Sequence, residues 1–161
     1  MARISLAALE EPSFPGLCPV TEAVNMLANS GIEERGAVFT RREVVEFILD
    51  LVGYNERRPI QSLRLLEPSF GDGDFLLPAV ERLLKAWSAT GGATSALADA
   101  VRAVELNRRS FQHTHNEVVL LLCRYGLAAE EAQTIADQWL IHGDFLLVPL
   151  EGSFDVVVGN P

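Results

Sequence analysis

Four short apolar runs that contain or end in polar residues place the strongest constraint on the fold of this chain. They read LRLLE, VRAVEL, WLIHGDFL and FDVVVGNP, and they cover residues 63–67, 101–106, 139–146 and 154–161. Segments with helical spacing of apolar residues lie between the first three runs, from Asp74 onward, over 108–125 and over 128–138. Strands that alternate with helices form βαβ units, which build a parallel sheet with helices on both faces. The sequence therefore predicts an α/β fold.

Polar residues stand at the carboxyl end of each predicted strand. They are Glu67, Glu105 with Asn107, Asp144 and Asn160. In parallel α/β sheets, ligands bind outside the carboxyl ends of the strands. Turns and helix caps also use polar residues, and for any single one of these positions that explanation is as good. Four such ends in one sheet favour a binding site.

The loop after the first strand, in LLEPSFGDGDFL, indicates the kind of ligand. Gly71 and Gly73 permit a tight turn and a close approach of the backbone to a ligand. A dinucleotide fingerprint needs a third glycine where Leu76 stands, and the chain has no Gly-Lys-Ser/Thr phosphate loop. Asp72 and Asp74 would repel a pyrophosphate, whereas an ammonium or sulfonium group would be favoured. The loop therefore favours S-adenosylmethionine over a phosphorylated cofactor.

Two further strand ends fit the same ligand. Glu105 lies 38 residues after Glu67 and is placed to accept hydrogen bonds from ribose hydroxyls, with a Gly/Ala/Ser-rich stretch absorbing the extra length. Asp144 could accept the exocyclic amino group of an adenine, and Phe145 could lie against its face. Core packing is an equally good explanation for Phe145.

The composition limits what the chain can bind on its own. Its 13 basic and 22 acidic residues give a net charge of −9, so this piece alone is a poor ligand for nucleic acid, whose phosphates require basic partners. Contacts to nucleic acid would have to come from another domain. Neither Cys18 nor Cys123 has metal-ligand spacing, and we expect His113 and His115 to be surface or satisfied residues. No metal site is expected.

The amino-terminal part divides into two regions. Residues 1–35 predict an irregular arm with a short helix over 20–28, and the main domain covers 36–161. No apolar stretch reaches the roughly 18 residues of a membrane span, and no secretion signal is evident, so we expect a cytoplasmic protein.

The segment GAVFTRREVVEFILDLVGY predicts a helix with an apolar face. Thr40 and Glu43 fit the capping-box pattern at its start, and Gly53 supplies its stop. The residues at helical spacing on the apolar face are Val44, Phe47, Ile48 and Leu51.

Five segments in order carry a family resemblance. GAVFTRREVVEFI, LLEPSFGDGDFL, AVELN, GDFL and VVVGNP together resemble the N-terminal catalytic region of N6-adenine DNA methyltransferases of restriction–modification systems, in the gamma-type motif order. The match runs from Gly36 to Pro161. It implies a Rossmann-like methyltransferase three-layer fold with a mostly parallel sheet, incomplete at the C-terminus. It also implies S-adenosylmethionine as the cofactor and double-stranded DNA as the substrate, bound through parts outside this chain.

The resemblance also implies a role for each matched residue. Phe39 and Thr40 would line the methionine end of the cofactor. Glu67, Gly71 and Gly73 would form the cofactor loop. Glu105 would hold the ribose, and Asp144 and Phe145 would hold the adenine. Asn160 and Pro161 resemble the start of the family's Asn-Pro-Pro-aromatic motif, in which two oxygens accept hydrogen bonds from the target amine. The target base must leave the duplex to reach them.

Several expectations follow from where the resemblance stops. The second proline and the aromatic residue of that motif are not in the chain, so we expect a truncated methyltransferase that is inactive or nearly so alone. One alternative is a non-catalytic module whose sheet is completed by a partner chain at the edge formed by residues 154–158. Another is a methyltransferase that acts on RNA or protein, because a shared fold does not fix the substrate.

Overall fold

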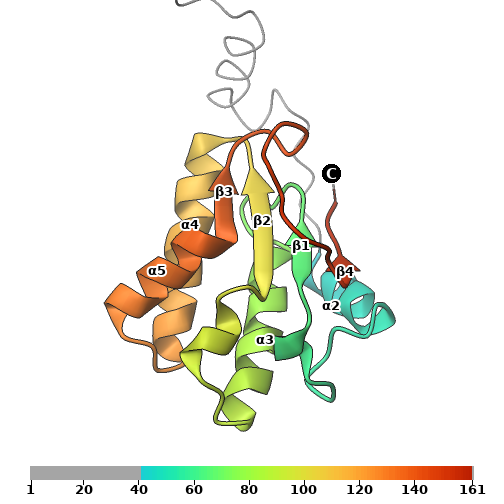
Figure 1. The fold of residues 1–161 in the computed structure, drawn as a ribbon. Coiled ribbons are helices and arrows are strands. Elements are labelled where there is room, and N and C mark those ends of the chain that lie inside the picture. The colour runs from blue at the N-terminus through green and yellow to red at the C-terminus, as the bar shows by residue number, and fades with distance from the viewer. Residues whose placement is uncertain (1–40, 161) are drawn as a thin grey trace, which may run out of the picture.

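The strands form a single parallel sheet in the computed structural model, which describes residues 41–160 (Figure 1). The order across the sheet is β3-β2-β1-β4, and every neighbouring pair is parallel. The strands are β1 (Leu65–Glu67), β2 (Val101–Glu105), β3 (Leu140–His142) and β4 (Val156–Val157). The predicted α/β class with a parallel Rossmann-like sheet is confirmed. Several predicted features lie outside the described residues: the arm, the helix over 20–28, Phe39, Thr40 and Pro161.

Helices connect the strands as the sequence pattern predicts. The helices of the described part are α2 (Arg42–Leu51), α3 (Leu76–Ala89), α4 (Arg108–Arg124) and α5 (Ala129–Trp139), with short 3₁₀ turns η2 (Ile60–Ser62) and η3 (Thr94–Leu97). Helix α3 joins β1 to β2, and both α4 and α5 lie between β2 and β3 in the chain. Because α3 packs against α2 on one side and α4 on the other, these three helices form one layer.

The core is built on the two central strands. All three residues of β1 are buried, as are four of the five in β2, because these strands have neighbours on both edges and helices over the sheet. The indole of Trp139 is fully buried, and its Nε1 donates to the carbonyl of Leu97, 2.7 Å away. Each fully buried large apolar side chain contributes about 1.5–3 kcal/mol to folding. The sheet therefore has a rigid centre on which strand ends can be positioned.

Strand β4 is short but well held beside β1. The backbone N–H groups of Asp155 and Val156 donate to the carbonyl of Arg64, and that of Val158 donates to Leu66. The guanidinium of Arg64 lies 4.7 Å from the centre of the Phe154 ring. The paired strand is shorter than the predicted run of 154–161 but occupies the predicted place.

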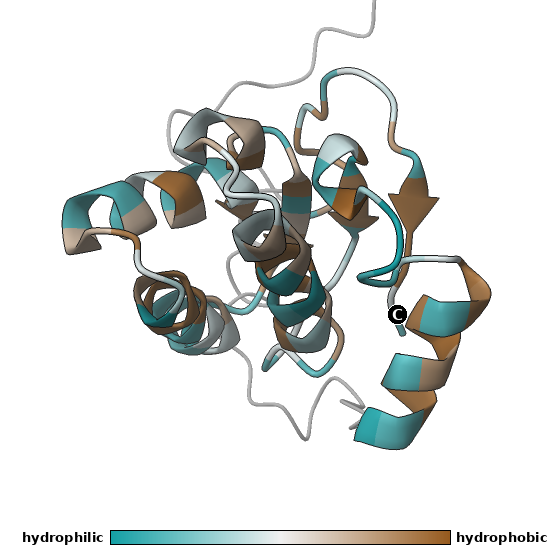
Figure 2. Ribbon diagram, turned by 90° about the horizontal axis from the view of Figure 1, so that it is seen from below, coloured by the Kyte–Doolittle hydropathy of each residue, from teal (hydrophilic) through white to brown (hydrophobic). Residues whose placement is uncertain are grey.

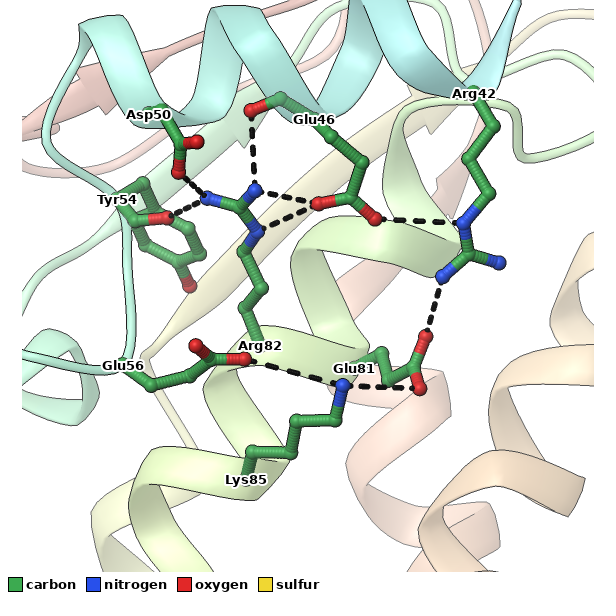
Figure 3. Close-up of polar contacts among 8 residues, drawn as sticks. All are labelled: Arg42, Glu46, Asp50, Tyr54, Glu56, Glu81, Arg82 and Lys85. Carbon is green, nitrogen blue, oxygen red and sulfur yellow. Dashed lines mark hydrogen bonds and ion pairs between the residues drawn. The ribbon is translucent and has the colours of Figure 1, made fainter.

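Helix α2 buries only part of its predicted apolar face. Val44, Phe47 and Leu51, expected on the apolar face, are 46%, 61% and 68% exposed, whereas Val45 and Leu49 are fully buried. Figure 2 shows that α2 has hydrophobic residues on its outer side as well. Arg82 of α3 donates to the carboxylates of Glu46 and Asp50, so part of the side of α2 that faces α3 is polar (Figure 3).

The ends of α2 agree more closely with the sequence. The helix begins at Arg42 with Arg41 as its N-cap, one residue after the predicted Thr40, and Arg41 makes no side-chain capping bond. Gly53 ends it with φ +73°, and the N–H of Tyr54 donates to the carbonyl of Leu49 at 2.8 Å. This is the left-handed glycine stop in which the chain turns back on the last helical turn.

Candidate functional site

Two buried acidic residues end the two central strands. Glu67 closes β1 and Glu105 closes β2, and their side chains are 2% and 4% exposed. The strands pair in parallel, with Glu67 opposite Ala103, so both acids reach the same edge of the sheet. Buried carboxyl groups are costly unless they are hydrogen-bonded or neutralised. Their placement therefore marks this edge as the candidate site.

Both carboxylate oxygens of Glu105 accept backbone N–H groups. Its Oε2 accepts the N–H of Gly71 at 2.8 Å, and its Oε1 accepts the N–H of Asn107 at 2.6 Å. Asn107 in turn caps α4, because its side chain accepts the N–H of Ser110 at 2.9 Å. Hydrogen bonds to an ionised acceptor are about twice as strong as neutral ones. Glu105 thus ties the glycine loop, residues 68–75, to the end of β2 and the start of α4.

Gly73 fits where a larger residue could not. Its φ is +91°, and a Cβ there would lie 2.9 Å from Cγ of Leu77 and 3.0 Å from Cγ2 of Thr114. Thr114 also donates from Oγ1 to the carbonyl of Gly71 at 2.9 Å. Thr114 of α4 therefore holds the glycine loop in place by packing and by a hydrogen bond. No sequence pattern indicated Thr114, because it lies in the middle of a helix and 43 positions from its partner.

Gly71 has a different environment. Its φ is +51°, and a Cβ added there would meet nothing within 4 Å. Hydrogen bonds from the backbone of Gly71 to Glu105 and from Thr114 to Gly71 hold the loop, and the space into which a Cβ of Gly71 would point is open. A ligand could approach the backbone closely at this point.

Glu67 is buried beside other carboxylates, and one of its oxygens has no hydrogen-bond partner among the described residues. Within the described residues no donor lies within hydrogen-bonding distance of its Oε2. Burial raises the pKa of Glu67 well above its usual range, and the nearby carboxylates of Glu105 and Asp74 raise it further. A cationic group placed here would neutralise the clustered carboxylates and occupy the free oxygen. The chemistry of these residues is compatible with a ligand that has a positive centre.

The end of β3 joins the same edge. The N–H of Gly143 donates to the carbonyl of Glu105 at 3.0 Å, which brings the next residue, Asp144, beside the end of β2. Asp144 is half-buried, and its Oδ1 accepts the N–H of Leu146 at 2.9 Å, so it shapes its own turn. Phe145 is half-buried as well. Figure 1 shows the chain leaving β3 and crossing toward β4 beyond these strand ends.

Aromatic side chains flank the site in a group that sequence reasoning did not identify. The ring of Phe111 lies 5.9 Å from that of Phe70 and 5.3 Å from that of His142, centre to centre. His115, 5.8 Å from Phe111, is buried and its Nε2 lies 2.8 Å from Oδ1 of Asp137. His115 is thus a satisfied histidine, as predicted.

In the described part of the chain, no group of three or more His, Cys, Asp or Glu is placed to hold a metal.

The last described residues reach the site from β4. A Cβ on Gly159 would lie 3.5 Å from Cδ of Pro68 and 3.7 Å from Cγ of Glu67. Asn160, which follows, is exposed. The structure therefore brings Glu67, Gly71, Gly73, Glu105 and the end of β4 together, with Asp144 at the neighbouring strand end. Phe39, Thr40 and Pro161 lie outside the described residues.

The pKa of Glu67 makes a prediction about stability. Because the folded state raises this pKa above the ordinary 4.5, the group favours folding most below pH 4.5 and loses that contribution as pH rises through its folded pKa. Glu67→Gln removes the titration while keeping the shape. Urea unfolding between pH 5 and 8 should show wild type losing stability relative to this variant, by up to about 1.4 kcal/mol per pH unit.

The control is Gln112→Ser, which exchanges one exposed residue that does not titrate for another. Its stability difference from wild type should not vary with pH. A constant difference between wild type and Glu67→Gln across the same pH range would contradict the assignment of a strained carboxyl at Glu67.

Comparisons with known proteins identify three relatives of the chain. The chain is 56% identical over 155 residues to the type II methyltransferase M.PaeR7I of Pseudomonas aeruginosa, which covers 94% of this chain and 27% of that protein. It is 48% identical over 133 residues to the type II methyltransferase M.XhoI of Xanthomonas vasicola, covering 80% and 24%. It is 35% identical over 144 residues to the type II methyltransferase M.BstVI of Geobacillus stearothermophilus, covering 84% and 26%.

Other comparisons add limits. No protein-family model and no solved structure matches the chain. Among the described helices, none is long and apolar enough to cross a membrane. The chain spans about a quarter of the length of the curated relatives it matches. Over most of its own length, the chain is homologous to type II methyltransferases.

Proposed function

We propose that this chain is the S-adenosylmethionine-binding part of a cytoplasmic, adenine-specific DNA methyltransferase of a restriction–modification system. The observation that carries the proposal is the buried Glu67 carboxyl, with an oxygen lacking a hydrogen-bond donor, beside the open backbone of Gly71. Homology to type II methyltransferases supports it. The proposed reaction transfers a methyl group to the N6 amino group of adenine.

The cofactor would be held by the residues gathered at the strand ends. S-adenosylmethionine supplies a methyl group on a positively charged sulfur, and Glu67 offers the negative charge that such a ligand favours. The open face of Gly71 admits close approach, while Gly73 keeps the loop compact against α4. Phe39 and Thr40 would line the methionine end.

Glu105 would combine two functions. Both of its oxygens already accept backbone N–H groups, from Gly71 and Asn107. The proposed contact of Glu105 with the ribose hydroxyls rests on its place at the carboxyl end of β2. Asp144 would accept the adenine amino group of the cofactor, and Phe145 would lie against that ring. Glu105 would thus hold the glycine loop through Gly71 and also contact the ribose.

Asn160 and Pro161 would position the target amine. The side-chain oxygen of Asn160 and the backbone carbonyl of the next residue would each accept an N–H from the exocyclic amino group. Two acceptors orient the nitrogen lone pair, and orientation of this kind accelerates a reaction without a general base. The target adenine must first leave the duplex, at a cost of a few kcal/mol.

DNA would be bound mainly outside these residues. A net charge of −9 opposes binding to a polyanion, and the relatives are about four times as long as the matched segment. Double-stranded DNA is therefore proposed as a partner of the whole methyltransferase. An RNA or protein acceptor remains the alternative substrate class, since the fold alone does not select among them.

Calorimetric titration of the chain with S-adenosylmethionine tests the cofactor site. Gly71→Ala and Gly91→Ala make a matched pair, because both positions have left-handed φ values (+51° and +61°) and open space around the added Cβ. Each should cost a similar 1–2 kcal/mol or so of stability. Only Gly71→Ala should weaken cofactor binding, since its methyl group would occupy the approach to the backbone. Equal affinities for the two variants would contradict the site.

A methylation assay on DNA lacking adenine methylation tests the reaction. Because the chain spans about a quarter of its relatives, we expect cofactor binding with little or no turnover by the chain alone. Rapid methylation by this chain would contradict that expectation. No detectable binding at about millimolar cofactor, from a chain shown to be folded, would overturn the proposed function itself.

A specific observation favours a second candidate, a module that completes its sheet with a partner. Within the described residues β4 pairs only with β1, and Val157 on it is 58% exposed. Helix α2 also exposes the apolar side chains of Val44, Phe47 and Leu51. Unpaired strand edges with apolar side chains are sites of association. This candidate is compatible with cofactor binding and concerns what covers the edge.

Light scattering on the purified chain tests the edge. If β4 and α2 form an interface, wild type should form a defined oligomer or bind a co-expressed partner chain, and Val157→Lys with Phe47→Ser should be monomeric. Gln112→Ser, at an exposed position on α4, serves as the control and should behave as wild type. A monomeric wild-type chain that stays soluble at high concentration would argue against the second candidate.

A further inference from the structure

Strand β4 leads to Asn160 and is joined to the sheet by few backbone bonds. Among the described residues it pairs only with β1, beside which it lies at the edge of the sheet (Figure 1). Three N–H groups of residues 155–158 donate to the carbonyls of Arg64 and Leu66. The bonds of a parallel ladder are evenly spaced, so equivalent bonds would form if the strand moved along β1 by two residues.

The apolar pattern of this segment does not fix its position either. Val156 and Val158 are buried and Val157 is 58% exposed, because successive side chains of a strand point to opposite faces. A shift by one residue would exchange the two faces, but a shift by two would put one valine in the place of another. Since each residue of a parallel strand advances about 3.3 Å, a shift by two would move Asn160 by about 7 Å.

Arg64, directly before β1, makes contacts that distinguish one register from the others. Its guanidinium lies 4.7 Å from the centre of the Phe154 ring, within the range of a cation–π contact. Its backbone N–H donates to Oδ2 of Asp155 at 2.8 Å. Its Nη1 and Nη2 donate to the carbonyls of Ser153 at 2.8 Å and Glu151 at 3.1 Å. Within residues 151–160 no other position offers an aromatic ring or an aspartate, so these contacts specify one register.

Gly152 allows the guanidinium to lie against this segment. Its φ is +79°, and an added Cβ would collide with Nη1 of Arg64. A residue with a side chain would therefore have to displace the guanidinium from the carbonyls that it binds. The segment before β4 thus has a shape that fits around Arg64.

The other end of the strand shows what this register provides. A Cβ on Gly159 would lie 3.5 Å from Cδ of Pro68 and 3.7 Å from Cγ of Glu67, and Asn160 follows directly. Glu67 is three positions after Arg64, so little of the chain separates the contacts at the two ends. The register that Arg64 selects therefore places Asn160 next to the residue that packs on the buried acid.

We infer that Arg64 is a positioning residue for the target-amine site: through Phe154 and Asp155 it selects the register of β4 on β1, and thereby places Asn160 at the carboxyl edge of the sheet. The inference rests on the proposed function, in which Asn160 accepts a hydrogen bond from the target amine. Arg64 lies at the opposite end of β1 and would touch neither the cofactor nor the base. Misplacement of a reacting group by about 1 Å is already costly, so a change of register would prevent methyl transfer.

Nuclear magnetic resonance on the chain tests the register without any ligand. In wild type, nuclear Overhauser contacts should join Gly159 to Pro68 and Glu67. These contacts should be lost in Arg64→Met and in Arg64→Lys, which keeps the charge but not the planar fork of donors. The amide of Val158 should also exchange about tenfold faster or more, while amides of β2 keep wild-type protection. Unchanged contacts and exchange would overturn the inference.

A pair of glycine variants tests the same contact from its other side. Gly152→Ala keeps Arg64 but puts a methyl group where Nη1 lies, so the Gly159 contacts should again be lost. Gly91→Ala is the matched control, because its φ of +61° is also left-handed and its added Cβ would meet nothing within 4 Å. It should have a similar backbone cost and keep the contacts. Equal loss of the contacts in both variants would point to general destabilisation and overturn the inference.

Cofactor binding, measured by calorimetry, separates this inference from the proposed function. Arg64→Met should bind S-adenosylmethionine as tightly as wild type, because Glu105 and Thr114 hold the glycine loop and neither contacts Arg64. Loss of cofactor affinity in a folded Arg64→Met would show that Arg64 supports the whole edge of the sheet, and would overturn its specific role at Asn160. Absence of binding by wild type would instead refute the proposed function.

Discussion

The contacts of Glu105 are the interaction on which the arrangement of the site depends. Its carboxylate accepts the N–H of Gly71 in the glycine loop and the N–H of Asn107 at the start of α4. Its backbone carbonyl accepts the N–H of Gly143 at the end of β3. One residue therefore sets the relative positions of three connections at the carboxyl edge of the sheet. Those connections could not keep their geometry if this carboxylate were absent, because the loop amide would lose its buried acceptor.

The same edge concentrates negative charge that the protein itself does not neutralise. Glu105 receives backbone donors, but the neighbouring Glu67 has an oxygen for which the described residues supply none. Burial and the adjacent carboxylates both favour the protonated form of Glu67. Under the proposed function, this negative edge would favour a cation over a phosphate. The two glycines with flanking aspartates, in place of a phosphate-binding sequence, are consistent with that proposal.

The periodicity and motifs predicted the parts of the fold that depend on local sequence. The four strands, the glycine loop and α3 to α5 lie where the apolar runs and glycines indicated, because buried parallel strands and helix stops leave local signals. The sequence pattern did not predict which residues of α2 are buried. Three of its four apolar residues at helical spacing are exposed, and its contacts with Arg82 join residues 32 to 36 positions apart, a pairing that no local pattern encodes. Thr114 was missed for the same reason.

The most direct test of the account is the number of protons released when S-adenosylmethionine binds. Calorimetry at pH 6 in two buffers of different ionisation enthalpy measures it, with S-adenosylhomocysteine, which lacks the sulfonium charge, for comparison. If the positive centre pairs with Glu67, wild type should release a fraction of a proton, bind the sulfonium form more tightly, and have an affinity that rises with pH, and Glu67→Gln should lose all three behaviours. Binding with no proton release and no preference between the two ligands would contradict the account.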